Sequence, residues 1–169
     1  MIRLRFCLLL ALLAACSLLL HQQSRAQERD DHLIVPWQRI GPITLGMNAE
    51  ELFGIMGHPT NTKRGALDRG VDVYTWRDDL SATITKDGAY VTQICAFNPS
   101  YATAQGIRPG SADRSVPALL GEPRRSRLFS AWWGASYTNL YWPGLMVSIH
   151  LEGFDKNHAV WEVCVNRFA

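Results

Sequence analysis

Alternation of apolar and polar residues in steps of two predicts that most of this chain forms β-strands. In residues 80–85, three apolar side chains alternate with three small polar ones, which is typical of a strand with one buried and one wetter face. Turn sequences such as Asp87-Gly88 and Pro143-Gly144 separate segments of this kind. The expected strands are residues 71–76, 80–85, 90–97, 137–142, 145–151 and 159–166, and an extra strand could form at 63–67.

Two segments instead carry the spacing of short amphipathic helices. The first begins at Asn48, whose side chain can cap the amide of Glu51 while Glu51 reaches back, and it ends at Gly57 and Pro59. The second contains Pro117, which has no amide hydrogen to donate. This helix is therefore either short, with Ser115 as its cap and the proline in its first turn, or distorted.

The first helical segment belongs to a repeat, because residues 43–59 recur 64 residues later as residues 107–123. Both copies precede strands, so we expect the α+β class, with two tandem αβββ units at 33–100 and 101–169. The short helices would pack on one face of an antiparallel sheet, which could be continuous and curved. The structural positions that repeat are Gly46, Gly57 and Pro59 in the first copy and Gly110, Gly121 and Pro123 in the second, with matching apolar residues between them.

The last predicted strands of the two units also match, since residues 91–95 align with residues 160–164. Alternation places Gln93, Cys95, Glu162 and Cys164 on one face. The opposite face, which we expect to lie under the helices, would carry Thr92, Ile94, Ala96, Trp161, Val163 and Val165. The two cysteines would either form one bridge between the units or remain packed thiols, and we expect the bridge, which requires the two final strands to meet at the centre of the sheet.

The N-terminus reads as an export signal. Two arginines precede an apolar run that ends before a small-x-small site at Ala26, so residues 1–26 are expected to be removed and residues 27–32 to form a flexible tether. The alternative is lipidation at Cys16, which ends a sequence of lipobox form and would anchor the protein to the outer membrane. The mature protein is thus expected to be periplasmic or secreted, with a membrane contact only if Cys16 is lipidated.

The net charge and the absence of known motifs argue against several classes of function. Loss of three arginines with the signal leaves 14 basic against 15 acidic side chains, so the surplus of positive charge that nucleic acid binding needs is absent. The remaining basic cluster, Arg124, Arg125 and Arg127, suits a protected strand edge. The sequence has no nucleophile motif, phosphate loop or metal-ligand spacing, and we expect no cofactor, no metal and no enzymatic activity.

The helix motif, Leu-Gly-Met-Asn at 45–48 and Met-Gly-His-Pro at 56–59 before an antiparallel meander, resembles a known unit. It is shared by BamE-type outer-membrane assembly lipoproteins and the β-lactamase inhibitor protein. The resemblance implies two units joined in one curved sheet and a role in enzyme inhibition or envelope assembly. The chain departs from the inhibitor by having one cysteine per unit instead of a disulfide in each, and by Ala112 and Pro117 in its second helix.

Aromatic residues crowd into the second half and suggest how a partner could be bound. Trp142 and Trp161 are expected in the core. Trp132 and Trp133 are adjacent in an extended segment and cannot both be buried, so one of them, together with Tyr141 and His150, is expected to bind another envelope or secreted protein. The alternative is a periplasmic protein that binds a small molecule or a cell-wall fragment on the same surface.

Overall fold

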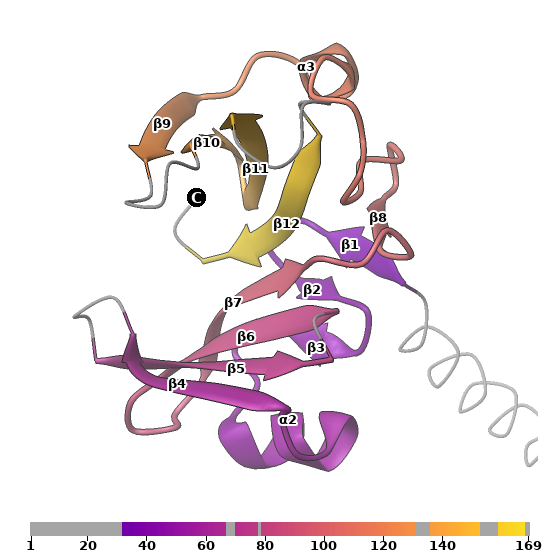
Figure 1. Ribbon diagram of the computed structural model, residues 1–169. Helices are drawn as coiled ribbons and strands as arrows, with labels where there is room; N and C mark the ends of the chain where they lie inside the picture. The colour runs from indigo at the N-terminus through magenta and orange to yellow at the C-terminus, as the bar shows by residue number, and fades with distance from the viewer. Residues whose placement is uncertain (1–31, 67–69, 78, 131–135, 153–158, 168–169) are drawn as a thin grey trace, which may run out of the picture. The chain divides into compact units, whose positions relative to one another are not determined.

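One antiparallel sheet of eight strands organises the fold, in the order β4-β5-β6-β7-β12-β11-β10-β9 (Figure 1). The computed structural model describes residues 32–66, 70–77, 79–130, 136–152 and 159–167. Together with a second sheet of four strands and two short helices, the sheet places the protein in the α+β class. Its strands are β4 (Asn61–Ala66), β5 (Val71–Trp76), β6 (Leu80–Thr85), β7 (Val91–Ala96), β9 (Arg125–Ser130), β10 (Ser136–Trp142), β11 (Leu145–Glu152) and β12 (Val160–Asn166).

In the large sheet each helix is followed by four strands where three were expected; the first strand after the first helix was anticipated as a possible extra strand at 63–67, and the first strand after the second helix was not expected. The additional strands are β4 and β9, which form the two edges of the sheet. Edge strands tolerate charged side chains and bury little of either face. Their sequences, Asn-Thr-Lys-Arg-Gly-Ala and Arg-Ser-Arg-Leu-Phe-Ser, consequently lack the alternation that marks the inner strands.

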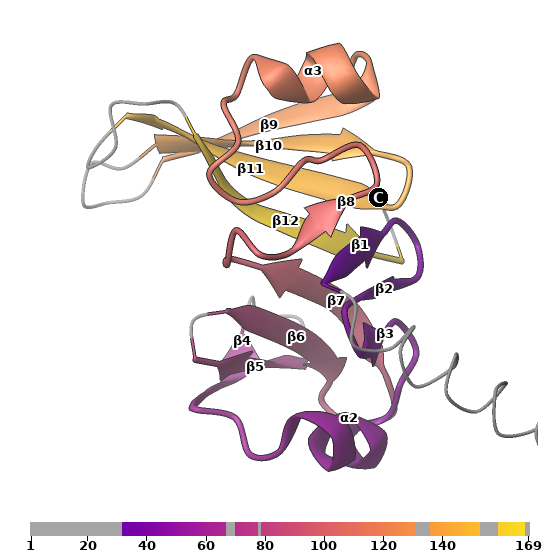
Figure 2. The ribbon, with the colours of Figure 1, turned by 90° about the vertical axis from the view of Figure 1, so that its right-hand side faces the viewer.

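A second, smaller sheet has the order β3-β2-β1-β8 and joins the segment before the first helix to residues 102–103 (Figure 2). It contains β1 (Leu33–Val35), β2 (Arg39–Ile40), β3 (Ile43–Thr44) and β8 (Ala102–Thr103). Pro36 and Pro42 fall in the turns between its strands, where the missing amide hydrogen costs no ladder bond. The prolines therefore interrupt strands here without preventing them.

The first helix, α2 (Ala49–Met56), has the predicted capping box. The Glu51 amide donates to Asn48 Oδ1 at 2.9 Å, and the Asn48 amide donates to Glu51 Oε2 at the same distance. The second helix, α3 (Ser115–Leu120), is the short form of the two alternatives, with Pro117 in its first turn. The cap position is Arg114 rather than Ser115, and no side chain caps it.

A single core joins both helices, the small sheet and one face of the large sheet. Leu52 of α2 and Val116 of α3 are fully buried in it, beside the inner strands β6, β7, β11 and β12. The alternation in β7 and β12 assigned the faces correctly for Ile94, Ala96, Val163 and Val165, all of which are buried in this core. Among the described residues, no helix is long and apolar enough to cross a membrane.

Gly57 provides a test of how α2 ends. Its φ of 70° and ψ of −163° belong to a region that only glycine occupies readily. Gly57→Ala should therefore destabilise the protein by about 1–3 kcal/mol, although no atom lies within 4 Å of the added carbon. Gly54→Ala, within the same helix and equally open, should stabilise by about 0.5–1 kcal/mol. Equal effects of the two variants on the free energy of unfolding would contradict the assigned conformation.

Candidate functional site

The face of the large sheet that points away from the helices carries a small apolar cluster of its own. We call this face the open face. Cys95, Met146 and Cys164 are buried there, and Phe97 and Tyr141 pack against them. These residues come from the central strands β7, β11 and β12 and their neighbours, so the cluster lies at the middle of the sheet.

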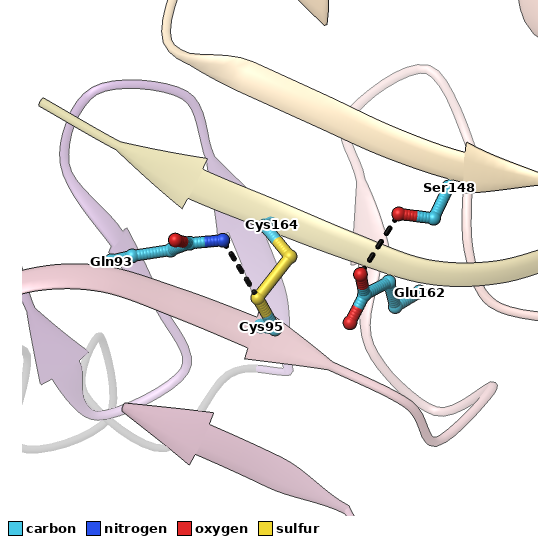
Figure 3. The surroundings of a disulfide bond; sticks show 5 residues. All are labelled: Gln93, Cys95, Ser148, Glu162 and Cys164. Atoms are coloured by element: carbon cyan, nitrogen blue, oxygen red, sulfur yellow. Dashed lines mark hydrogen bonds between the residues drawn. A yellow bond between two sulfur atoms is a disulfide. The ribbon is translucent and has the colours of Figure 1, made fainter. Parts of the chain in front are cut away.

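A disulfide bond forms the centre of the cluster (Figure 3). Cys95 and Cys164 are direct partners in the β7–β12 register, with Cα atoms 4.0 Å apart. The two final strands therefore meet at the centre of the sheet, which is the geometry that the bridge requires. A disulfide is consistent with export to an oxidising compartment.

A row of polar residues crosses the open face beside the disulfide. The register pairs Arg127 with Asn139, Asn139 with Ser148, and Ser148 with Glu162. The Ser148 hydroxyl donates to Glu162 Oε1 at 2.8 Å (Figure 3). Asn139 is buried, and its Oδ1 has no hydrogen-bond partner within the described part of the chain. The row thus presents acceptor groups, and Glu162 adds a negative charge.

Glu162 is the electrostatically unusual residue of this row. Burial raises the pKa of its carboxyl group, and the hydrogen bond from Ser148 opposes that rise only in part. Among the described residues, Ser148 is its sole hydrogen-bond partner, and no cation is paired with it. Ionising a carboxyl group in such a position costs free energy unless a positively charged group lies beside it.

The carboxylate also lies near both cysteine sulfurs. The Glu162 oxygen and the sulfurs of Cys95 and Cys164 all lie within 4.8 Å of one another, a spacing that could hold a metal ion if both thiols were free. In the disulfide the two sulfurs are bonded to each other and no thiolate is available. In the oxidised protein this group is therefore a bridge beside a carboxyl group and not a metal centre.

Trp161 is the functional candidate that the sequence interpretation placed wrongly. It was expected in the core, but 56% of its surface is exposed and its ring lies 6.3 Å from that of Phe97. The reason is a β-bulge: the register shifts between Ser148, which pairs with Glu162, and Ile149, which pairs with Val160. Trp161 is the extra residue, so simple alternation does not apply to it. The same irregularity in β7 leaves Thr92 extra.

The other predicted binding residues divide into three groups. Tyr141 lies on the open face against the disulfide cluster, as its alternation with the buried Trp142 predicts. The backbone of His150 pairs with Tyr137, while its side chain lies outside the described residues. Trp132, Trp133 and Cys16 also lie outside the described residues, and the aromatic group that the structure places on the open face is Phe97, Tyr141 and Trp161.

A pH series tests the environment of Glu162. The pKa of Glu162 in the folded state lies above the ordinary value of 4.5. Below about pH 4.5 the carboxyl group is protonated in both the folded and the unfolded state, so its burial does not change the free energy of unfolding. As the pH rises through the folded-state pKa, the buried group destabilises the protein increasingly. Glu162→Gln keeps an acceptor for Ser148 and removes the charge. We expect it to match the wild type in thermal unfolding near pH 4 and to be the more stable protein at pH 8. Glu122→Gln, at an exposed position, controls for the loss of a negative charge. A stability gain at pH 4 as large as at pH 8 would contradict the assignment.

The comparisons with known proteins return two secreted bacterial proteins. No family model and no curated protein matches the chain. One similar structure is an extracellular protein containing a SCP domain from Bacillus anthracis, with 11% identity, a TM-score of 0.45, and coverage of 72% of this chain and 43% of that one. Another is a cysteine-rich secretory protein from Staphylococcus aureus, with 9% identity, a TM-score of 0.48, and coverage of 83% and 49%. The chain spans less than half the length of either protein.

These matches correct the family resemblance drawn from the helix motif. The structures found are SCP-domain and cysteine-rich secretory proteins, not BamE-type lipoproteins or the β-lactamase inhibitor protein, so that resemblance was wrong. The motif is short and consists of residues that cap and end a helix, such as Asn48, Glu51 and Gly57. Residues with those roles recur wherever a short helix precedes a strand, and they do not identify a family.

Proposed function

We propose that this chain is a non-enzymatic exported binding protein whose open face contacts another protein. The observation that carries the proposal is Trp161, more than half exposed beside Phe97 and the apolar disulfide cluster, on a sheet face opposite the helices. Aromatic anchors of this kind dominate the energetics of protein interfaces. Inhibition of an enzyme or assembly of envelope components would both use such a surface.

The chemistry around the anchor suggests what the partner presents. Within the described part of the chain no cation pairs with the carboxyl group of Glu162, and Ser148 and Asn139 continue the row with oxygen acceptors. A partner that places a lysine or arginine here would neutralise the charge and fill the acceptors. The apolar area around Met146 and Phe97 would cover the remainder of the contact.

We further propose that the sheet arose from two tandem units, residues 33–100 and 101–169. The support is a set of matching hydrogen bonds between the turn before each helix and the last strand of the same unit, with the turn residues 64 positions apart and the strand residues 69 positions apart. The Gly46 amide donates to the Val91 carbonyl and the Val91 amide to Met47, while the Gly110 amide donates to the Val160 carbonyl and the Val160 amide to Ser111. These bonds engage Val91 and Val160, each directly before the extra residue of its strand, so the two strands carry the same irregularity at matching places.

A second matching pair lies at the helix ends. The indole N–H of Trp76 donates to the Gly57 carbonyl at 3.2 Å, and that of Trp142 donates to the Gly121 carbonyl at 3.1 Å. Each bond fastens the end of a helix to the end of a strand in its own unit. The two units would then join through β7 and β12, with the disulfide at the junction.

In this proposal the export signal is cleaved after Ala26, and the mature protein is periplasmic or secreted. The alternative is lipidation at Cys16, which would hold the protein at the outer membrane. Mass spectrometry of the mature N-terminus distinguishes the two.

Co-purification from envelope extract and culture medium tests the function itself. We expect tagged mature protein to recover one partner protein in stoichiometric amount. A monomer that carries a bound small molecule or a cell-wall fragment on the open face would contradict the proposal.

A further inference from the structure

A pocket on the helix side of the sheet is separate from the open face. Its volume is about 290 Å³, and it lies between the end of α2 and the turn that joins β5 to β6. Met56, Trp76 and Leu80 give it an apolar floor, and the charged side chains of Arg77 and Asp79 lie at its rim. Pockets for drug-sized ligands occupy about 300–1,000 Å³, so this one suits a smaller molecule.

Among the described residues, few polar contacts engage the charged side chains at the rim. Within the described residues, the backbone of Arg77 donates to Thr60 Oγ1, but its guanidinium has no partner. One oxygen of Asp79 accepts from Asn98 at 2.7 Å, and the other has no partner. No ion pair joins Arg77 to Asp79 in this described region, so the two opposite charges do not neutralise each other at close range.

Hydrogen bonds hold the walls of the pocket in place. The Asp79 amide donates to the Trp76 carbonyl at 2.9 Å, and the Phe97 amide donates to the Asp79 carbonyl at 2.9 Å. The indole of Trp76 is fixed by its bond to Gly57. Arg77 has a φ of 47°, a conformation that a non-glycine residue keeps only when its surroundings enforce it. A site fixed in this way loses little conformational entropy when a ligand binds.

At the equivalent place in the second half of the chain, the ring of Trp37 packs against the turn. There the turn after Trp142 is the short Pro143-Gly144, and the ring of Trp37 lies so close that a Cβ on Gly144 would be 2.4 Å from it. The residue 64 positions after Trp37 is Tyr101, which lines the pocket instead of closing on the turn. The longer turn with Arg77 and Asp79 is thus what distinguishes the first half.

From this geometry we propose that the pocket binds a free α-amino acid with an apolar side chain. The ligand's carboxylate pairs with the Arg77 guanidinium, whose planar fork suits a carboxylate. Its ammonium group pairs with Asp79, and its side chain rests on Met56, Trp76 and Leu80. The site requires neither the open face nor a protein partner, so an experiment on it tests this proposal independently of the proposed function.

Nitrogen-edited NMR titrations of the mature protein test the proposal with four compounds. L-Leucine should shift the amide signals of residues 56–58, 60, 76, 77, 79 and 80 in a saturable way. N-Acetyl-L-leucine lacks the ammonium group, and L-leucinamide lacks the carboxylate. Each should bind with a Kd at least about 10-fold higher than that of leucine, as expected for the loss of one charge-assisted pair. Glycine, which lacks the side chain, should also bind more weakly.

Two variants test which charged group of the ligand is bound by Arg77 and which by Asp79. Arg77→Gln should weaken leucine and N-acetyl-L-leucine while leaving L-leucinamide unchanged, and Asp79→Asn should weaken leucine and L-leucinamide while leaving N-acetyl-L-leucine unchanged. Arg124→Gln, at an exposed position in the second half, should bind leucine like the wild type. Equal shifts from all four compounds, or no saturable shift at about 10 mM leucine, would overturn the proposal.

Discussion

Replacing Cys95 and Cys164 together by alanine is expected to lower the free energy of unfolding by about 4 kcal/mol. The bridge joins residues 69 positions apart, and the loop-entropy relation assigns a closure of that length about 4 kcal/mol. The bond also ties β7 to β12, the one place where the first four strands of the large sheet meet the last four. Thermal unfolding should therefore shift down by about 10 °C or more.

The reduced wild-type protein is the matched control for this variant. It lacks the bond but keeps both sulfur atoms, so agreement between the two assigns the loss to the bond and not to the missing volume in the cluster with Met146. An alanine pair that unfolds within about 1 kcal/mol of the oxidised wild type would show that the junction is held by strand pairing and the core alone.

Trp161→Ala should weaken binding of the partner by about 2 kcal/mol or more, equivalent to about 30-fold in Kd. The indole is 56% exposed, so its loss should change the free energy of unfolding by less than about 0.5 kcal/mol. Leu119→Ala is the matched control, because Leu119 is 51% exposed on α3, on the opposite side of the sheet. Titration calorimetry with the co-purified partner measures the affinity of each variant. Equal losses of affinity for the two variants would contradict the assignment of the interface.

Local sequence signals were sufficient for the inner strands, the capped helix and the pairing of the two cysteines. Leu80, Ala82 and Ile84 are buried as their alternation predicts, and Asn48 caps α2 with Glu51. The edge strands β4 and β9 were weak or missed because edge strands do not need an apolar face. The small sheet was missed because its strands are two or three residues long, too short for any periodicity to appear.

The candidate site could be predicted only in part, since the bulge in β12 is a tertiary feature. Val160 pairs with Ile149 of β11 and also bonds to Gly110 and Ser111 in the turn before α3, and Trp161 is the extra residue between Val160 and Glu162. Nothing in residues 159–166 alone marks that position. The matching of residues 91–95 with residues 160–164 was the available signal, because it places Thr92, a polar residue, at the site equivalent to Trp161.

Photo-crosslinking in cells that export the protein tests most directly whether a partner contacts the open face. Benzoylphenylalanine is introduced at position 161 in one sample and at position 119 in another. We expect irradiation to give one discrete adduct, of this protein with one other protein, from position 161 and none from position 119. An adduct from position 119 with none from position 161 would place the partner on the helix side and contradict the account.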